Sequence, residues 1–323
     1  MTKTVSFVLP FYNEENNLPV LFHRLLALSA QLTCATEFVF VNDGSTDGSL
    51  AYLAGLIPQH GNVRVVDLSR NFGQMTAVHA GLRHAAGDAV IIMDTDLQDR
   101  PEAVQDFIAE WERGADVVYA IRANRKESFI KRALFRSFYA VFRRLAEIPI
   151  PEEAGLFSLM DRRVVDLLVA LPERNRYIPG LRAWVGFRQV GVTVERDRRG
   201  DKLPRQSFIG LVKMASDAIF SFSRVPLRIA TTLGIVAVSL AVVAAALVLY
   251  MRFVSHLAIP GWASTLISIF FLGAVQLICL GILGEYLGRI YEEVKRRPHY
   301  VVRQVLGCTP DAGAATAPTP EPK

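Results

Sequence analysis

Short apolar runs and longer amphipathic segments alternate along roughly the first 120 residues of the chain. The short runs are rich in Val, Ile and Phe, which favour β-strands, and the segments between them have helical spacing of their apolar positions. We expect strands over residues 5–9, 37–41, 63–67, 89–93 and 117–120. We expect helices to begin near residues 16, 48, 73 and 101. This alternation predicts an α/β domain in which helices cover a parallel sheet.

Two long uncharged segments follow near the C-terminus. Residues 229–251 and 257–284 contain no Asp, Glu, Lys or Arg, and each run exceeds the ~20 residues that cross a bilayer core. Basic residues precede the first run and follow the second, so the positive-inside rule predicts cytoplasmic outer flanks. We therefore predict a transmembrane hairpin, with a helical hairpin buried in a soluble protein as the alternative.

Composition and charge narrow the compartment and the partners. The net charge of +5 suits anionic partners such as lipid headgroups, sugar nucleotides or nucleic acid, but no nucleic-acid-binding module is legible. The three cysteines have no CxxC spacing, so neither a disulfide framework nor a zinc site is indicated. The N-terminus passes directly into a strand-like run without a signal peptide, which predicts a cytosolic first domain.

Two further segments have amphipathic character. Residues 128–148 interleave basic and aromatic side chains, which fits either a surface helix packed on its own domain or an interfacial helix facing lipid headgroups. Residues 208–222 predict an amphipathic helix at the membrane interface. The expected layout is a catalytic domain over 1–205, a juxtamembrane helix over 206–228, two transmembrane helices within 229–284, a cytoplasmic segment over 285–308 and a disordered tail over 309–323.

Polar clusters follow three of the predicted strands. The fourth strand ends in Asp94-Thr95-Asp96, with Gln98 close behind. Two carboxylates and an amide oxygen are suitable ligands for Mg²⁺ or Mn²⁺ and leave positions for substrate phosphates. Any strand that ends in a polar turn can show such a pair, so this motif gains weight only from its neighbours.

The neighbouring clusters close the first two strands, at residues 10–15 and 42–47. Asp43 can accept hydrogen bonds from a base or a ribose hydroxyl, Tyr12 can lie beside the base, and Gly44 permits close approach of the backbone. Each cluster also has a structural explanation as a turn or helix cap. In open α/β sheets ligands bind beyond the carboxyl ends of the strands, which is where all three clusters are expected.

Taken in order, these motifs resemble the family 2 glycosyltransferases of the GT-A (Rossmann-like) fold. Within them, the chain is most similar to polyprenyl-phosphate glycosyltransferases with a C-terminal membrane hairpin, such as dolichol-phosphate mannose synthase and bacterial enzymes that glucosylate undecaprenyl phosphate. The resemblance spans nearly the whole chain. The segments that carry it are 10–15, 43–47, 68–73, 93–99, 184–187 and 221–228.

The resemblance implies roles for individual residues. Asp94, Asp96 and Gln98 would hold the metal and the diphosphate, and Arg199 and Lys202 would be basic residues on the phosphates. Many relatives have Ser or Thr before that lysine, where this chain has an aspartate, so Arg205 is a substitute phosphate ligand. The residues implied for binding the nucleoside or the substrate are Pro10, Tyr12, Glu14, Asp43 and Arg70.

One departure from the family lies at residues 155–160. This chain has Gly-Leu-Phe-Ser-Leu-Met there, whereas many relatives have Gly-Asp-Phe-Arg-Leu-Met, so Leu156 and Ser158 replace an acid and a base. A phosphate monoester acceptor already carries negative oxygen at neutral pH, so attack on the anomeric carbon needs no general base. The replacement is therefore compatible with catalysis, or it reflects a different sugar or acceptor contact.

The sequence thus predicts a metal-dependent glycosyltransferase acting beside a membrane. The resemblance implies inverting transfer from a UDP or GDP sugar to a polyprenyl phosphate. It also implies a multi-pass protein of the inner membrane whose catalytic domain is cytoplasmic. The protein would assemble as a homo-oligomer, by resemblance a tetramer. The alternative is a catalytically inactive nucleotide-binding membrane partner of a glycan-assembly complex, which Leu156 and Ser158 suggest. The identity of the sugar stays open.

Overall fold

A computed structural model of the protein describes residues 2–122, 154–173, 176–194, 225–253 and 261–307. The chain divides into two compact units, and each is described by itself. The first contains a mixed sheet and its covering helices together with the chain from residue 297 onward, and the second contains two long helices. The two predicted interface segments, 128–148 and 208–222, and the predicted tail, 309–323, lie outside the described residues.

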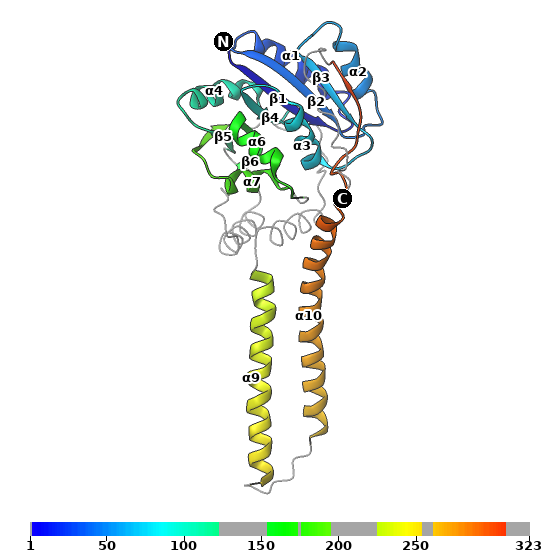
Figure 1. Cartoon of the computed structure of the whole chain (residues 1–323), viewed down its shortest axis with the longest axis vertical. Helices are drawn as coiled ribbons and strands as arrows, with labels where there is room; N and C mark the ends of the chain where they lie inside the picture. Colours follow the sequence, from blue (N-terminus) through cyan, green and yellow to red (C-terminus); the bar gives the residue numbers. More distant parts are fainter. Residues whose placement is uncertain (1, 123–153, 174–175, 195–224, 254–260, 308–323) are drawn as a thin grey trace, which may run out of the picture. The chain divides into compact units, whose positions relative to one another are not determined.

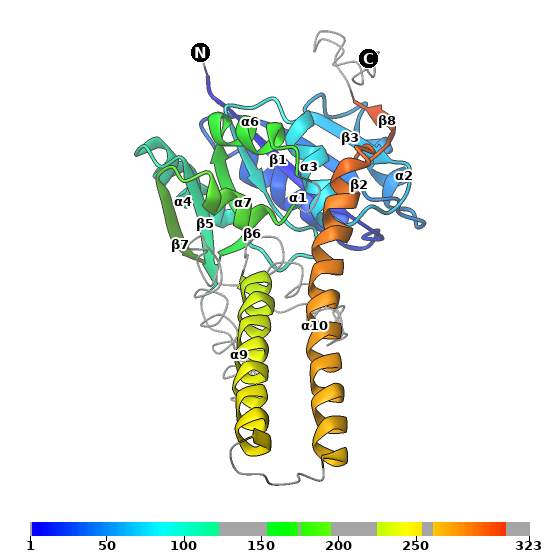
Figure 2. The same cartoon turned by 60° about the horizontal axis from the view of Figure 1, so that its bottom comes forward.

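The first unit is built on an eight-stranded sheet with the order β7-β5-β6-β4-β1-β2-β3-β8. Figure 1 labels β1 to β6 of this sheet, and Figure 2 labels β7 and β8. The strands are β1 Thr4–Phe11, β2 Ala35–Asn42, β3 Val63–Leu68, β4 Ala89–Ile92, β5 Val117–Arg122, β6 Ala154–Asp161, β7 Gln189–Val194 and β8 Val302–Leu306. All five strands predicted from the apolar runs are present. The α/β class is therefore confirmed.

The prediction of a parallel sheet is wrong for two strands. β6 lies antiparallel between β4 and β5, and β8 lies antiparallel to β3 at the edge of the sheet. A parallel neighbour needs a crossover that carries the chain back to the starting end of the sheet. The chain enters β6 and β8 at the edge of the sheet where the parallel strands end, so these two strands run antiparallel to β4 and β3. β6, β7 and β8 are not among the strands predicted from the apolar runs.

Helices cover both faces of this sheet, and the alternation of side chains along the strands supplies both cores. The helical elements of the first unit are α1 Asn17–Ser29, α2 Ser49–Leu56, α3 Gln74–His84, a 3₁₀ turn Pro101–Ala103 leading into α4 Val104–Glu112, α6 Arg162–Ala170 and α7 Ile178–Trp184. Phe7, Phe38 and Phe40 face a core shared with α1 and α4. On the other face, Gly81 of α3 lies so close to Val8 that a Cβ atom there would clash, at 2.3 Å from its Cγ1.

The second unit contains α9 Val225–Phe253 and α10 Trp262–Val294, which run side by side (Figures 1 and 2). The Cys279 thiol of α10 lies 3.5 Å from the Ala230 carbonyl oxygen of α9. At 1.5 Å per residue each helix is longer than the ~30 Å hydrocarbon core of a bilayer. Both helices predicted from the uncharged runs are thus confirmed as helices.

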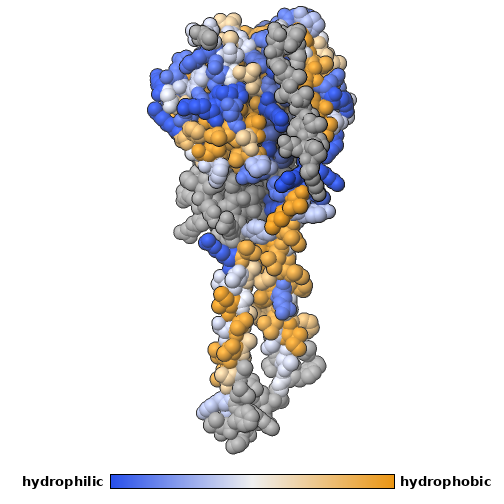
Figure 3. Space-filling view, viewed as in Figure 1, coloured by the Kyte–Doolittle hydropathy of each residue, from blue (hydrophilic) through white to orange (hydrophobic). Residues whose placement is uncertain are grey.

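Many apolar side chains are exposed along α9 and α10, and the hydropathy colouring shows some of them on the face drawn in Figure 3. By length and composition, the spans Leu227–Ala244 and Ser268–Val294 could each cross a membrane, and only 6% and 0% of them are buried. Ile235 and Phe270 are 63% and 73% exposed. Helices buried in a soluble core would not expose such side chains, so these helices fit the predicted membrane hairpin.

Candidate active site

The polar clusters predicted at the strand ends come together at one edge of the sheet. β1 is parallel to both β2 and β4, with Phe11 beside Asn42 and Val8 beside Ile92. The residues that follow these three strands therefore share the carboxyl edge, as in other open α/β sheets. Of the predicted site residues, this edge collects Pro10, Tyr12, Glu14, Asp43, Arg70, Asp94, Asp96 and Gln98.

The loops after β1 and β2 are tied together by several of their own polar groups. Asn13 has a positive φ of 54°, its N–H donates to Ser45 Oγ at 3.0 Å, and its side-chain oxygen accepts from Thr46 N at 2.8 Å. Glu15 accepts from the N–H of Gly48, the residue before α2. These contacts support the turn-and-cap explanation for Asn13, Ser45 and Glu15.

Glu14 and Tyr12 have different environments within this loop. Glu14 is buried, its backbone oxygen accepts from the first N–H groups of α1, and its carboxylate accepts from Asn17 Nδ2 at 2.6 Å. Tyr12 is 42% exposed. The tyrosine ring therefore offers a surface on which a base could stack, whereas the glutamate also organises the start of α1.

Asp43 holds the loop that follows β3. Its two carboxylate oxygens accept from Phe72 N at 2.7 Å and Gly73 N at 3.0 Å. Burial raises the pKa of Asp43, while these two N–H groups and the nearby Arg70 counteract part of the rise. Arg70 lies over the Phe72 ring at 4.0 Å from its centroid. The carboxylate predicted to bind the nucleoside thus also joins the β2 and β3 loops.

Asp94 and Asp96 follow β4 in a tight turn. Leu97 has a positive φ of 60°, and Asp96 Oδ1 accepts from Gln98 N at 3.2 Å. Asp94 Oδ1 accepts from Gln74 Nε2 at 2.7 Å, so the first residue of α3 contacts the first carboxylate of the pair. Gln74 is not among the site residues predicted from the sequence, although its place directly after the Asn-Phe-Gly of residues 71–73 is a usable signal.

These residues are compatible with a divalent cation that also binds substrate. Among the described residues, no cluster of three or more His, Cys, Asp or Glu side chains could hold a metal by itself. Asp94 and Asp96 nevertheless supply hard oxygen donors and are partly exposed after the end of β4, and the remaining ligands of Mg²⁺ can be phosphate oxygens and water. The predicted phosphate ligands Arg199, Lys202 and Arg205 lie outside the described residues.

The segment after α10 contributes to the same edge of the sheet, which the sequence analysis did not foresee. We call residues 299–306 the C-terminal strap. Its Val301 oxygen accepts from Ser69 N at 2.9 Å, and Arg303 donates to the Ser69 oxygen at 2.8 Å. Arg303 also lies 3.7 Å from the fully buried carboxylate of Asp67, which accepts from Asn42 at 2.8 Å. The strap therefore supports the loop that Asp43 holds.

His79 of α3 lies under the strap. Its ring is 6.2 Å from that of His299 and 6.0 Å from that of Tyr300, and it is almost fully buried. Burial, with help from nearby cationic groups, lowers the pKa of His79 to about 3, so the imidazole is neutral at physiological pH. This histidine therefore serves the packing of the strap against α3.

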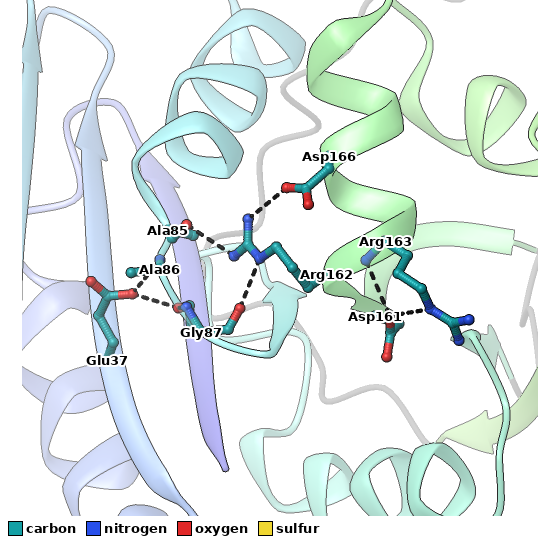
Figure 4. Close-up of polar contacts among 9 residues, drawn as sticks. Glu37, Ala85, Ala86, Gly87, Asp161, Arg162, Arg163 and Asp166 are labelled. Carbon is teal, nitrogen blue, oxygen red and sulfur yellow. Dashed lines mark hydrogen bonds and ion pairs between the residues drawn. The ribbon is translucent and has the colours of Figure 1, made fainter. Parts of the chain in front are cut away.

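The opposite edge of the sheet has a cavity of about 380 Å³ lined by charged residues that largely pair with one another. Figure 4 shows Arg162 donating to the oxygens of Ala85 and Gly87, both at 2.9 Å, and Arg163 contacting Asp161. These contacts fix the junction of β6 and α6 to the loop before β4. Because the strand termini there are the amino ends of the parallel strands, we place the site at the other edge.

Comparison with known proteins identifies the family. The sequence model of glycosyl transferase family 2 matches residues 6–168. An uncharacterised glycosyltransferase of Synechocystis sp. is 44% identical over 95% of this chain and 97% of its own. A prophage-derived bactoprenol glucosyl transferase of Shigella flexneri is 38% identical over 93% of this chain and 97% of its own.

Solved structures add a more distant likeness. The crystal structure of mannosyl-3-phosphoglycerate synthase from Rubrobacter xylanophilus is 22% identical, covers 67% of this chain and 72% of its own, and has a TM-score of 0.45, which is too low to bear on the assignment. The family match instead covers β1 to β6, apart from the first two residues of β1, and the polar clusters that follow β1, β2 and β4. On these matches the chain belongs to glycosyl transferase family 2.

Proposed function

We propose that this protein transfers a sugar from a nucleoside diphosphate sugar to undecaprenyl phosphate, or a similar polyprenyl phosphate, at the cytoplasmic face of the inner membrane. The observation that carries the proposal is the match to bactoprenol glucosyl transferases, which extends over 93% of this chain and thus includes the two apolar helices as well as the sheet. A lipid acceptor explains why an enzyme of this family would need such helices.

The residues at the carboxyl edge have distinct roles in this proposal. Asp94, Asp96 and Gln98 would hold Mg²⁺ or Mn²⁺, which when bound supplies positive charge to the departing diphosphate. The exposed Tyr12 would stack on the base. Pro10, Glu14, Asp43 and Arg70 would shape the nucleoside site, while Arg199, Lys202 and Arg205 would bind phosphates.

Transfer would proceed with inversion, by in-line attack of the acceptor phosphate on the anomeric carbon. The phosphate oxygen forms the new bond while the bond to the diphosphate breaks, and no proton has to leave the nucleophile. The buried Leu156 and Ser158 carry no acid or base, which is consistent with a reaction that needs none. Positioning of the two substrates is then the main task of the protein.

The hairpin of α9 and α10 would anchor the enzyme beside its lipid substrate. Arg224 precedes α9 and Arg228 lies in its first turn, and residues 295–297 follow α10 as Lys-Arg-Arg. This distribution supports a cytoplasmic position for both flanks by the positive-inside rule. Assembly as a homo-oligomer, by resemblance a tetramer, belongs to the same proposal.

The test uses the full-length protein in detergent, undecaprenyl phosphate and a panel of radiolabelled UDP and GDP sugars. We expect label to enter the organic phase with at least one donor and to be abolished by EDTA. Asp96→Asn should lose the activity, whereas the matched change Asp106→Asn, at an exposed position of α4, should retain it. No lipid-linked product with any donor would refute the proposal.

The second candidate is a membrane partner that binds nucleotide without turnover, which the replacements at Leu156 and Ser158 favour. It predicts UDP or GDP binding by the purified protein but no product. It also predicts that Asp96→Asn leaves glycan assembly in cells unchanged, whereas the enzymatic proposal predicts its loss.

A further inference from the structure

The C-terminal strap lies beside the loops after β1, β2 and β3. We call these three the donor loops, because they carry most of the residues proposed to hold the nucleoside. The strap's strand β8 pairs antiparallel with β3 and belongs to the same compact unit as the rest of the sheet. The chain reaches the strap shortly after α10, which ends at Val294, and the strap lies beyond residues 6–168, which the family model matches. A segment from the far end of the chain thus joins the donor side of the sheet.

A β-bulge in β8 brings two neighbouring side chains of the strap onto one buried carboxylate. Asp67 pairs with Gln304 and Leu68 with Val302, so Arg303 is the extra residue at this shift of register. Neighbouring side chains of a regular strand point to opposite faces, whereas a bulge turns one of them. Here Arg303 Nη1 lies 3.7 Å and Gln304 Nε2 lies 3.4 Å from the same oxygen, Oδ2 of Asp67. The bulge therefore directs both side chains to Asp67.

Asp67 connects the strap to the donor loops through a series of hydrogen bonds, which we call the relay. Its other oxygen, Oδ1, accepts from Asn42 Nδ2 at 2.8 Å. Asn42 Oδ1 in turn accepts from Ser45 N at 2.9 Å, and Ser45 Oγ accepts from Asn13 N at 3.0 Å. Asn13 directly follows Tyr12, the residue proposed to stack on the base. The relay thus runs from the end of β3 across the loop after β2 to the loop after β1.

Arg303 also holds the third donor loop directly. Its Nη2 donates to the backbone oxygen of Ser69 at 2.8 Å, at the start of the loop after β3. At the other end of this loop Asp43 accepts from the N–H groups of residues 72 and 73. Arg70, which is proposed to contact the donor, lies between these two fixed points. One side chain of the strap therefore contacts both the relay and the loop that presents Arg70.

Closing the edge of a sheet does not require these polar side chains. Backbone hydrogen bonds to β3 and the packing of Leu306 against the core would already cover the edge. A buried carboxylate is costly unless it is paired and hydrogen-bonded, and Asp67 is fully buried. A polar network whose members bond to one another favours a single arrangement of its parts. The contacts of Arg303, Asp67 and Asn42 therefore fix the geometry of the loops in addition to covering an edge.

We propose that Arg303 is a positioning residue for the sugar-nucleotide donor. By holding Asp67 and Ser69 it keeps the donor loops in the arrangement that binds the nucleoside, so the strap sets the affinity for the donor through these loops. This inference rests on the proposed function, since it takes the carboxyl edge of the sheet as the place of the donor. It gives the segment after the two apolar helices a part in donor binding at the sheet.

The experiment compares the full-length wild type in detergent with Arg303→Ala, Arg303→Lys and Leu306→Ala. The dissociation constant of UDP is measured by calorimetry with Mg²⁺, well below every melting temperature, so that each variant is folded. We expect Arg303→Ala to raise this constant about fivefold or more, an effect typical of residues that act on a site through others. Arg303→Lys should lie between, because lysine keeps a positive charge near Asp67 but lacks the planar fork that also reaches Ser69.

The matched control Leu306→Ala separates positioning from the stability of the strap. Leu306 packs against the core and pairs with Val65, which precedes Asp67 in β3 and lies further from the donor loops. Its truncation removes buried apolar contacts and should lower the melting temperature, while the dissociation constant of UDP should change less than about twofold because the relay is intact. If UDP affinity instead falls in both variants in step with their melting temperatures, Arg303 serves only the stability of the strap and the inference is overturned.

A double variant tests whether Arg303 acts through Asp67. In Asp67→Asn the neutral amide no longer needs a cation beside it, so Arg303→Ala should weaken UDP binding less in that background than in wild type. An equal loss in both backgrounds would overturn the relay. In sugar transfer, the donor KM of Arg303→Ala should rise while kcat stays within about twofold of wild type. A fall in kcat with an unchanged donor KM would contradict a role in donor positioning.

The binding and transfer assays can fail separately, because UDP binding needs no turnover. If lipid-linked product forms but Arg303→Ala binds UDP as wild type does, the positioning role is wrong and the proposed function stands. If the UDP affinities follow the expected order but no donor yields product, the proposed transfer fails while the role of Arg303 in nucleotide binding stands.

Discussion

Gly44 is the residue at which a single methyl group should disturb the donor side of the site most. Its φ is +72°, in the region that favours glycine, and it lies where the loops after β2 and β3 meet. A Cβ atom there would lie 2.5 Å from the carbonyl carbon of Arg70 and 2.6 Å from the backbone N of Asn71. Because both clashing atoms belong to the backbone, rotation of a side chain cannot relieve the contact.

The expected cost of Gly44→Ala follows from these two effects. The left-handed conformation costs a non-glycine residue about 1–2 kcal/mol, and separation of the loops adds to it, so we expect a loss of about 2 kcal/mol or more. For a domain of this size such a loss lowers the melting temperature by about 4–8 °C. Separation of the loops should also lengthen the hydrogen bonds that Asp43 accepts from Phe72 and Gly73 and weaken UDP binding.

The assay is thermal unfolding of the detergent-solubilised protein, together with calorimetric titration of UDP. The matched control is Gly55→Ala in α2, where a Cβ atom would have no neighbour within 4 Å. Alanine favours a helix over glycine by up to about 1 kcal/mol, so the control should unfold at the same or a higher temperature. If Gly44→Ala unfolds with the control and binds UDP as wild type does, the geometry assigned to these loops is wrong.

Three further predictions concern the strap, its histidine and the metal. Arg303→Ala should lower the free energy of unfolding by about 1–3 kcal/mol in a denaturation assay, since it deprives the buried Asp67 of a cation. The control Arg24→Ala, which breaks an exposed ion pair, should cost less than about 1 kcal/mol in the same assay. Because the pKa of His79 is lowered in the folded protein, the unfolded chain binds a proton at this histidine first as the pH falls. The contribution of His79 to stability is therefore complete above pH 6.5 and falls as the pH drops toward 3. His79→Phe should flatten the decline in melting temperature between pH 6.5 and 4.5, and parallel melting curves for the variant and wild type across this range would contradict the prediction. Dialysis against EDTA should abolish sugar transfer and Mg²⁺ or Mn²⁺ should restore it, and full activity in chelator would refute the assignment of the carboxylate pair.

Local patterns predicted the parts of the fold that depend on local burial. The apolar runs at 5–9 and 89–93 became β1 and β4 because a strand buried on both faces is apolar at most of its positions, with the buried Ser6 as the exception in β1. The two uncharged runs became α9 and α10 for a similar reason, since their length and composition suit a helix that crosses a bilayer. The position of Asp94 and Asp96 at a strand end could also be predicted from the residues before them.

The interplay of Asp43 and Gln74 with the loops required the structure. Before folding, Asp43 could be explained equally by a turn, a cap or a ligand. In the structure its carboxylate accepts from Phe72 and Gly73, about 30 residues further along the chain. The side chain of Gln74 reaches Asp94 only because β3 and β4 flank the β1–β2 pair and α3 crosses between them. A sequence pattern shows neither that Asp43 contacts the loop after β3 nor that Gln74 contacts Asp94.

The sequence by itself determined which segments are buried, which helices are apolar enough for a membrane, and which strand carries the carboxylate pair. Tertiary structure alone decided that β6 runs antiparallel beside β4, that β8 closes the edge at β3, and that Arg182 lies over Tyr119. The spacing of apolar positions along a segment indicates which of its side chains are buried, and this is a property of that segment alone. Strands are joined by backbone hydrogen bonds, which nearly every residue can make, so these bonds do not distinguish one strand partner from another. The partner and its direction are instead selected by how segments distant in the sequence pack together.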